Sequence, residues 1–388
     1  MVTEAWFRTP DDEGTTPFLL DPTASSDARQ LISNWPFYRP SPLRQLDRLA
    51  TQLGVARIQA LDESRRLPLK SFKMLGAVYA VTQVVARETR GQIPAKLVFN
   101  PEAGENTASL MGNTRLVAAS DGNHGRALAW VAHKLGVDCA IYLPLNVSRG
   151  REQRIQDYGA DTIRISGNYD AAVNKAHQDA IENGWIIIQD TVLEGFEDCC
   201  LDIMHGYTML AHEAMQQFEG QGGRIPSHVF VQAGVGGFAG ATASYLASRF
   251  GKDGPVIVVV ESVLADCVMT SLKRGSRTAV GGSHDTKMVG IACGEVSEIA
   301  WSLLRHLTDC AVTIDDSQAL QTLRLMVELN PQLEIGETGV AGLAGIQAVC
   351  LDPELRDQLG IDEQSDLLAF ITEGITDEDS YRTFIHGQ

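Results

Sequence analysis

Short apolar runs rich in Val, Ile and Leu alternate along the chain with stretches in which polar and apolar residues are mixed. Most of these runs are apolar throughout, which is typical of parallel strands that helices cover on both faces. Residues 73–87 instead follow a helical period. The pattern predicts an α/β protein with open, mostly parallel twisted sheets covered by helices. The expected strands are 55–61, 97–100, 114–120, 139–143, 161–165, 185–189, 229–232, 256–260 and 367–371.

The residues that follow these strands are the first place to look for chemistry. Ligands of open parallel sheets bind beyond the carboxyl ends of the strands. Polar or glycine-rich residues stand at four such ends, namely 120–126 (Ser-Asp-Gly-Asn-His-Gly-Arg), 189–190 (Gln-Asp), 233–240 (Ala-Gly-Val-Gly-Gly-Phe-Ala-Gly) and 372–374 (Thr-Glu-Gly). We therefore expect the functional residues to come from these segments.

Length and charge restrict the class of protein. A chain of 388 residues is long enough for two or three domains. Its 49 acidic and 32 basic residues leave a net charge of −17, which disfavours nucleic acid and anionic membranes as partners. The densest apolar run, 256–260, is too short to span a bilayer, and the first residues do not resemble a signal peptide. We expect a cytoplasmic protein without a membrane partner.

The seven cysteines give no metal-binding pattern. They stand at 139, 199, 200, 267, 293, 310 and 350, with no pair of C-x-x-C motifs. This spacing argues against zinc and against a secreted disulfide scaffold, and no other metal site is expected. The simplest interpretation is a set of small buried apolar side chains.

The segment 229–240 predicts a strand, a glycine turn and the start of a helix, where free backbone N–H groups bind phosphate. Three interpretations are open. Gly234, Gly236 and Ala239 fit a dinucleotide fingerprint, with Glu261 as the acid that binds a ribose. The glycines can instead serve only tight packing of strand and helix. The third interpretation is a cup for pyridoxal phosphate (PLP), which requires a lysine elsewhere.

Lys73 is such a lysine, because it begins the apolar helical stretch rather than lying on a polar face. Desolvation disfavours the charged form of an amine placed in this way and makes it a better nucleophile toward an aldehyde. The alternative is an ordinary lysine whose stem lies along the surface and whose amine stays in water. Lys70, three residues earlier, is the neighbouring lysine with no such placement.

Several motifs together resemble a known family. Ser-Phe-Lys at 71–73, Ser-Asp-Gly-Asn-His at 120–124, Gly-Val-Gly-Gly at 234–237 and Thr372 resemble the fold-type II PLP enzymes, the group of tryptophan synthase β and threonine dehydratase. Within that group the chain resembles the diaminopropionate ammonia-lyase family, from about residue 40 to 377. The segments that carry this closer resemblance are 62–64, 120–126, 189–191 with 194–195, 265–267, 292–295, 336–339 and 372–374.

The resemblance implies a role for particular residues. Lys73 would carry PLP as a Schiff base, and Asn123 would bond the 3′-oxygen of the cofactor. Gly234, Val235, Gly236 and Gly237 would hold the phosphate. Thr372 would face the pyridine nitrogen, and because a hydroxyl cannot protonate that nitrogen as a carboxylate would, elimination is favoured over transamination.

The resemblance also implies a fold and an assembly. Two domains would share the active site between them, a large PLP-binding domain of residues 1–75 and 195–388 and a smaller domain of residues 76–194. A homodimer is expected. Cys267 and Cys293 fall where members of this family can carry a disulfide, although a cytoplasmic chain favours thiols.

Two aspartates follow strands and can be read in two ways. Asp121 and Asp190 can each cap the helix that follows. The chemical interpretation, which the resemblance implies, is that they and Lys73 serve opposite faces of the substrate and so opposite enantiomers. Together with Ser120 they would also bind the substrate, whose second ammonium group a carboxylate recognises. His124 is expected to be a structural hydrogen-bonding residue.

These observations predict a PLP-dependent lyase that converts 2,3-diaminopropionate, a small amino-acid substrate, to pyruvate and two ammonia. One alternative is a serine or threonine dehydratase-like β-eliminase for another β-substituted amino acid. An NAD-dependent dehydrogenase, or a PLP-binding homologue without activity, would belong to a different class. Leu193 and the segment 196–200 depart from the family pattern, so the substrate preference stays open.

Overall fold

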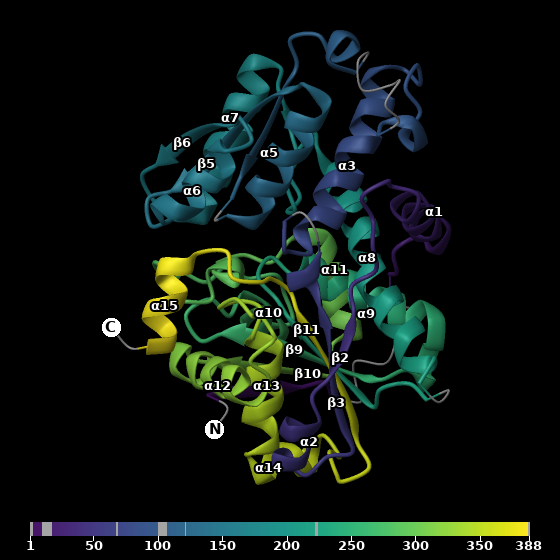
Figure 1. The fold of residues 1–388 in the computed structure, drawn as a ribbon, viewed down its shortest axis with the longest axis vertical. Coiled ribbons are helices and arrows are strands. Elements are labelled where there is room, and N and C mark those ends of the chain that lie inside the picture. Colours follow the sequence, from purple (N-terminus) through teal and green to yellow (C-terminus); the bar gives the residue numbers. More distant parts are fainter. Residues whose placement is uncertain are drawn as a thin grey trace. The chain divides into compact units, whose positions relative to one another are not determined.

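The computed structural model describes residues 3–9, 18–66, 69–99, 107–120, 122–221 and 224–386 (Figure 1). The chain divides into two compact units. Unit 1 comprises Met1–Pro22, Pro40–Arg66 and Leu210–Gln388, and unit 2 comprises Thr23–Arg39 and Leu67–Met209.

Unit 1 contains a sheet of seven strands in the order β1-β10-β9-β8-β11-β3-β2. The inner strands are parallel, whereas β1 and β2 pair antiparallel at the two edges. The strands are β1 (Glu4–Phe7), β2 (Leu43–Gln45), β3 (Arg57–Asp62), β8 (His228–Gln232), β9 (Val256–Ser262), β10 (Cys310–Ile314) and β11 (Asp366–Ile371). Every residue of β8, β10 and β11 is buried, as expected for parallel strands with helices on both faces.

Unit 2 contains a fully parallel sheet of four strands in the order β6-β5-β4-β7. The strands are β4 (Arg115–Ala119), β5 (Asp138–Pro144), β6 (Asp161–Ile165) and β7 (Ile186–Ile187). One face packs against α7 around Val117, Ala140 and Ala176, with Leu193 and Phe196 at the margin of this cluster. The carboxyl ends of β4 and β7, which are neighbours, carry residues 120 and 188–190.

Helices connect the strands in both units. They are α1 (Pro22–Ser33), α2 (Asp47–Leu53), α3 (Lys73–Glu88), α5 (Asn123–Leu135), α6 (Arg149–Gln156), α7 (Tyr169–Asn183), α8 (Glu197–Glu219), α9 (Gly237–Phe250), α10 (Cys267–Arg274), α11 (Glu298–Leu307), α12 (Asp316–Leu329), α13 (Ala341–Cys350), α14 (Pro353–Gln358) and α15 (Glu378–His386). One hydrophobic cluster of unit 1 lies between its sheet and the helices α2, α12 and α13.

The two units differ from the two predicted domains. Some segments that the prediction places in the large domain belong to the smaller unit. Residues 23–39, 67–75 and 195–209 group with unit 2, so Lys73 belongs to the smaller unit. The Ser25 hydroxyl is hydrogen bonded to His205 Nδ1 (2.9 Å), a contact between residues 180 positions apart. The hydrophobic pattern of a sequence does not indicate which distant segments pack together. For this reason the predicted ranges place α1 and the first half of α8 in the large domain.

Most predicted strands are present, with ends shifted by one or two residues, and 185–189 is reduced to the two residues of β7. One prediction is wrong: the run from Leu97 closes a short 3₁₀ turn (Ala95–Leu97), and Val98 and Phe99 pair with no strand. Asn100 lies outside the described residues. The sequence also missed β1 and β2, because short edge strands have neither the length nor the apolar content of most inner ones. The inner strand β10 was missed as well, although all five of its residues are buried.

Two helices of unit 2 cross at very short range, where both carry glycine. A Cβ on Gly206 of α8 would lie 2.7 Å from the carbonyl oxygen of Leu75 and 2.9 Å from the Cα of Gly76 in α3. A Cβ on Gly76 would in turn lie 2.5 Å from the Tyr207 ring. Only glycine at both positions allows this approach, which sets the place of Tyr207 beside the start of α3.

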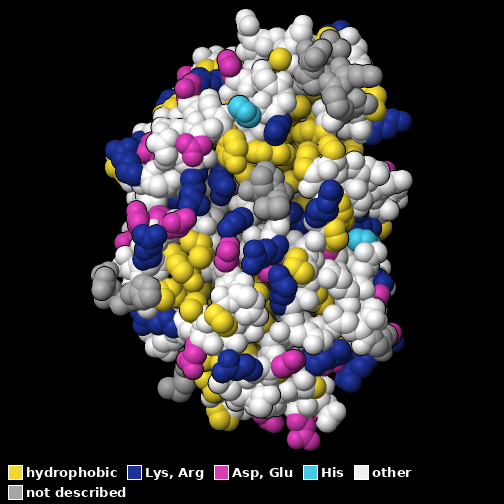
Figure 2. Space-filling view, viewed as in Figure 1, with side chains coloured by type: hydrophobic (Ala, Val, Ile, Leu, Met, Phe, Trp, Pro, Cys, Tyr) yellow, Lys and Arg dark blue, Asp and Glu magenta, His cyan; other side chains and the backbone are white. Residues whose placement is uncertain are grey.

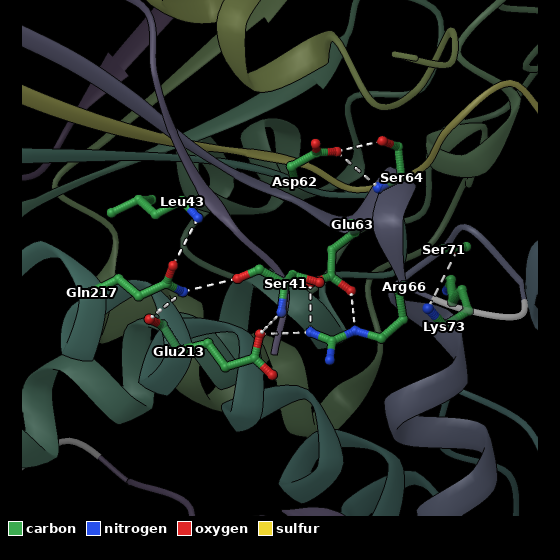
Figure 3. A network of polar contacts seen from close by, with 10 residues as sticks. All are labelled: Ser41, Leu43, Asp62, Glu63, Ser64, Arg66, Ser71, Lys73, Glu213 and Gln217. Carbon is green, nitrogen blue, oxygen red and sulfur yellow. Dashed lines mark hydrogen bonds and ion pairs between the residues drawn. The ribbon is translucent and has the colours of Figure 1, made fainter. Parts of the chain in front are cut away.

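A buried ion cluster closes the end of β3, seven residues before Lys73 (Figure 3). The Arg66 guanidinium donates to both oxygens of Glu63 and to Glu213 Oε2 at 2.7–2.9 Å. Glu213 Oε2 also accepts the backbone N–H of Ser41 (2.9 Å). All three charged side chains are buried, and the carboxylates raise the pKa of Arg66 against the opposing effect of burial. The cluster ties three separate segments of unit 1 together.

The surface carries both signs of charge. On the face drawn in Figure 2, Lys and Arg side chains lie among Asp and Glu, so the excess of acidic residues is not gathered there. Within the described part of the chain, no helix is both long and apolar enough to cross a bilayer. The same residues hold no group of three or more His, Cys, Asp and Glu side chains arranged for a metal ion.

Candidate active site

Lys73 and Asp190 meet in unit 2. Lys73 is the first residue of α3, and Asp190 follows β7 by three residues. The Lys73 Nζ forms a short ion pair with Asp190 Oδ2, and the side chains are only 16% and 4% exposed. Two groups 117 positions apart in the sequence are thus brought into direct contact in a nearly dry environment.

Aromatic rings line the Lys73 amine. Its Nζ lies 5.3 Å from the centre of the Phe72 ring and 5.8 Å from that of the buried Tyr207. The two rings lie 4.9 Å apart. Ring faces attract a cation and also exclude water, so the amine is held in place by Asp190 and by these faces rather than by solvent.

Asp190 is an ionised carboxylate in a buried position. Burial by itself would raise the pKa of Asp190, but the Lys73 ammonium, His124 and hydrogen bonds from Lys73 and Tyr169 hold that pKa well below its usual range. The Oδ1 atom accepts a hydrogen bond from the Tyr169 hydroxyl (3.1 Å). A buried, ionised carboxylate of this kind can act as a proton acceptor once its cation is engaged elsewhere.

The segment that follows β4 turns directly into α5. The Ser120 hydroxyl accepts the backbone N–H groups of Gly122 (2.9 Å) and Gly125 (2.8 Å) and so caps the first turn of that helix. Asn123 is the first residue of α5. Asp121, the second predicted base, lies outside the described residues. Its role therefore stays a prediction.

His124 has a structural contact. Its Nε2 lies 2.6 Å from the carbonyl oxygen of Ile188, and because a carbonyl only accepts, this nitrogen must carry the hydrogen. Burial lowers the pKa of His124, which favours the neutral ring. The ring joins the start of α5 to the segment that leads to Asp190.

The glycine turn of unit 1 leads from β8 into α9. Gly236 has φ +87°, a left-handed conformation that favours glycine, and it immediately precedes the first residue of the helix. A Cβ on Gly236 would lie 3.0 Å from both Ala300 and Leu304, and one on Gly234 would lie 3.0 Å from Cys293 Sγ. The turn at 234–237 therefore has a bare backbone at a helix N-terminus, where N–H groups and the helix dipole favour a phosphate.

Thr372 follows β11, the sheet neighbour of β8, and is buried. Its hydroxyl oxygen accepts a hydrogen bond from Gln232 Nε2 (2.9 Å). Gln232 Nε2 also lies 3.2 Å from the carbonyl oxygens of Thr338 and Phe370, which fixes its amide. Because the hydroxyl oxygen accepts from Gln232, the proton of Thr372 stays available for another acceptor.

Glu261 does not serve as a ribose-binding acid. It is fully buried, and its two oxygens accept the backbone N–H groups of Val268 (2.8 Å) and Met269 (2.6 Å) in the first turn of α10. Burial raises the pKa of Glu261 to about 8. Its place at the end of β9 is explained by capping of a helix, which removes the main support for a nicotinamide site.

The seven cysteines, all among the described residues, are buried thiols without a disulfide. Cys267 and Cys293 both lie beside the glycine turn. The Cys267 thiol donates to the Gly234 carbonyl oxygen (3.5 Å), and Cys293 Sγ is the atom nearest to a Cβ built on Gly234.

Sequence reasoning missed the contacts of three side chains near Lys73 and Asp190. Tyr169 begins α7, and nothing in its local pattern marks it. Gln189 belongs to a recognised motif, but its orientation toward Tyr169, with Nε2 2.7 Å from the hydroxyl oxygen, depends on the sheet. Tyr207 is likewise explained only by the crossing of α3 and α8.

The residues fit PLP. The glycine turn has the bare backbone that a phosphate needs, and Thr372 offers a buried hydroxyl instead of a carboxylate. Lys73 supplies an amine in a dry, aromatic environment. A mostly parallel sheet that leads into this turn in unit 1, and this lysine at the start of α3 in unit 2, define a PLP-dependent enzyme of mixed α/β architecture.

Comparison with known proteins agrees with this class. The family described as "Pyridoxal-phosphate dependent enzyme" matches residues 35–373, and the chain belongs to this family. The diaminopropionate ammonia-lyase of Escherichia coli strain K12 is 35% identical over 379 residues, with 96% of this chain and 94% of that protein covered. The enzyme of Salmonella typhimurium strain LT2 is 33% identical, with the same shares covered.

Solved structures agree in fold. The E. coli diaminopropionate ammonia lyase, in complex with an aminoacrylate-PLP azomethine reaction intermediate, has a TM-score of 0.88 and 32% identity, covering 99% of this chain and 98% of that chain. The threonine deaminase isoform 2 of Solanum lycopersicum has a TM-score of 0.75 at 18% identity, covering 100% and 97%. The fold-type II assignment predicted from the sequence is confirmed.

Proposed function

We propose that this chain is a lyase that uses PLP to eliminate ammonia from 2,3-diaminopropionate. The observation that carries the proposal is the ion pair between Lys73 and the buried, ionised Asp190. Similarity to diaminopropionate ammonia-lyases over nearly the whole chain supports the same substrate. Water and one diaminopropionate would give one pyruvate and two ammonia.

Several residues would hold the cofactor. Lys73 would bind it covalently through its amine, and the backbone of Gly234, Val235, Gly236 and Gly237 would hold its phosphate. Thr372 would donate its hydroxyl hydrogen to the ring nitrogen, and Asn123 would bond the 3′-oxygen. When bound, PLP withdraws electrons from the substrate Cα and makes its proton acidic.

Asp190 would accept the Cα proton at Oδ2, the oxygen that pairs with Lys73 in the structure. The electron pair of the broken C–H bond then forms a double bond between Cα and Cβ, and the β-ammonium group leaves as ammonia. The released aminoacrylate takes up water and gives pyruvate with a second ammonia. Asp121 would serve the opposite face, while Ser120, Asp121 and Asp190 would contact the substrate.

A pyruvate assay tests the proposed reaction. Purified protein supplied with PLP is expected to release pyruvate from both isomers of 2,3-diaminopropionate, with two ammonia per pyruvate, and to release less from D- and L-serine or threonine. Lys73→Arg is expected to abolish turnover, because a guanidinium cannot attach the cofactor. Lys70→Arg, the matched control, should stay active. Pyruvate from serine alone would instead support a dehydratase.

Variants of the two aspartates are expected to affect different isomers of the substrate. Asp190→Asn should lower kcat/KM for the L-isomer by ~10²–10⁴-fold, because an amide keeps the shape but accepts no proton. Asp121→Asn should act in the same way on the D-isomer. Since Asn caps helices nearly as well as Asp, two enzymes close to wild type would mean that both residues are only caps. Equal large losses on both isomers would indicate recognition of the ammonium group instead.

We further propose a cytoplasmic homodimer, on the strength of the family resemblance alone. Light scattering coupled to gel filtration measures the assembly directly, and a single peak at the mass of one 42.1 kDa chain would contradict it.

A further inference from the structure

The amide of Gln189 has a fixed orientation. Its Oε1 accepts the backbone N–H of Ala119 (2.9 Å), and its Nε2 lies 3.2 Å from the carbonyl oxygen of the same residue. A flipped amide would place donor against donor and acceptor against acceptor. The last residue of β4 therefore determines that Nε2 is the atom that faces Tyr169.

This orientation fixes the direction of the next hydrogen bond. Gln189 Nε2 lies 2.7 Å from the hydroxyl oxygen of Tyr169, and an amide nitrogen can only donate. The phenol oxygen is therefore the acceptor, and its single hydrogen points toward Asp190 Oδ1, 3.1 Å away. The chain of donors runs one way, from the amide of Gln189 through Tyr169 to the carboxylate.

The two oxygens of Asp190 thus have separate partners. Oδ1 accepts from the Tyr169 hydroxyl (3.1 Å) and, at the longer distance of 3.4 Å, from Gln189 Nε2, whereas Oδ2 pairs with Lys73. In the proposed reaction the substrate amine would displace Lys73 from the cofactor and release it as a neutral amine that no longer neutralises Asp190, so that Tyr169 remains as a fixed donor to the buried carboxylate. A donor at Oδ1 holds the carboxylate plane and leaves Oδ2 for a proton.

We propose that Tyr169, oriented by Gln189, is a positioning residue that holds Asp190 as the base for the L-isomer. The inference rests on the proposed function and deepens it, since it says which contact makes one of the two aspartates effective. Tyr169 acts through Asp190 and does not itself exchange a proton with the substrate.

Tyr169→Phe tests the proposal, with Tyr142→Phe as its matched control. Tyr142 also donates its hydroxyl to a carboxylate in unit 2, Asp179 Oδ2 (2.7 Å), but this pair has no contact with Lys73. Tyr169→Phe should lower kcat/KM for the L-isomer by ~10-fold or more, the equivalent of one hydrogen bond to a charged group. The D-isomer should be unaffected, and Tyr142→Phe should change neither isomer.

The pH profile separates positioning from mere packing. Loss of the Tyr169 donor removes one of the groups that lower the pKa of Asp190, so the acid limb of kcat/KM for the L-isomer should move to higher pH. A purely structural role would reduce both isomers alike and leave the acid limb in place. That result would overturn the proposal.

Gln189→Glu tests the direction of the chain without removing Tyr169. A carboxylate at this position would attract the Tyr169 hydrogen, so Asp190 would lose its donor and the same L-specific loss should appear. Wild-type kinetics in Gln189→Glu would mean that the direction inferred here is wrong.

The contact can also be measured without the reaction. In cofactor-free protein, the urea midpoint of the double variant Tyr169→Phe, Asp190→Asn should differ from the sum of the two single changes. The midpoint of Tyr142→Phe, Asp190→Asn should equal the sum of its two single changes. Additive effects of the first pair would overturn the inference whatever the activity. If the effects of Tyr169→Phe and Asp190→Asn are coupled but the protein releases no pyruvate, the contact between the two residues is supported and the proposed function is contradicted.

Discussion

At the scale of the residue, Lys73 illustrates why the type of side chain does not decide its chemistry. Lys70 and Lys73 are three positions apart in one motif. Lys73 places its amine beside two aromatic rings and a buried carboxylate. Lys73 begins α3, whereas Lys70 lies before the helix with φ +54°.

The glycine turn allows a prediction at the same scale. Gly236→Asp should weaken PLP retention, because it adds a negative charge where N–H donors converge. Gly236→Asn has the same size and also tolerates positive φ, so the difference between the two variants isolates the charge. Absorbance during dialysis measures the PLP that each variant retains. Equal retention by Asp and Asn variants would place the phosphate elsewhere.

At the scale of the element, the crossing of α3 and α8 is the contact that fixes the start of α3. Gly206→Ala should destabilise unit 2 by ~1–3 kcal/mol, because its methyl group would meet the backbone at Leu75 and Gly76 rather than a flexible side chain. Gly281→Ala is a matched control, since a Cβ there has no atom within 4 Å. Thermal melts of cofactor-free protein compare the variants. A Gly206→Ala protein as stable as wild type would show that the helices separate without cost.

The carboxyl end of β9 shows how an element uses a carboxylate that resembles a ligand site in the sequence. Glu261 follows a glycine-turn motif at a spacing that suits a dinucleotide site. Its oxygens are instead used by the N–H groups of α10, an eight-residue helix that begins five residues after β9. Short helices leave free N–H groups at their start, and a buried carboxylate satisfies two of them.

At the scale of the whole molecule, Glu261 gives stability a dependence on pH. Its folded pKa is about 8, above the ordinary value of 4.5. Between these values the unfolded chain is ionised while the folded protein keeps the proton, so the free energy of unfolding falls as pH rises across this window. The contribution is at most about 1.4 kcal/mol per pH unit.

Glu261→Gln should flatten the decline in melting temperature between pH 5 and pH 8, because an amide carries no proton to lose. The variant should also be less stable than wild type at pH 5, since an amide has one acceptor for two N–H groups. Glu363→Gln, at an exposed position, is the control and should follow the wild-type curve. A Glu261→Gln curve parallel to wild type would mean that Glu261 is ionised in the folded state.

The sequence predicted the local parts of this protein well. Buried parallel strands such as β8 and β9 contain continuous apolar runs, and the helix that begins at Lys73 has a clear period, so both were predicted within one or two residues. The resemblance to the PLP family and the choice of Lys73 rested on short motifs, each of which consists of residues that are consecutive in the sequence. Edge strands were missed, and the strand at 97–100 was wrong, because short runs carry little pattern.

What only the tertiary structure decided are the contacts between distant segments. Lys73 meets Asp190, and Ser25 meets His205, through sheet order and helix crossings that no local pattern encodes. The same holds for the donor chain from Ala119 through Gln189 and Tyr169, whose direction depends on a strand and a helix start placed side by side. A sequence determines which groups are available, and packing determines which of them share a buried, low-dielectric environment in which a single hydrogen bond changes the chemistry.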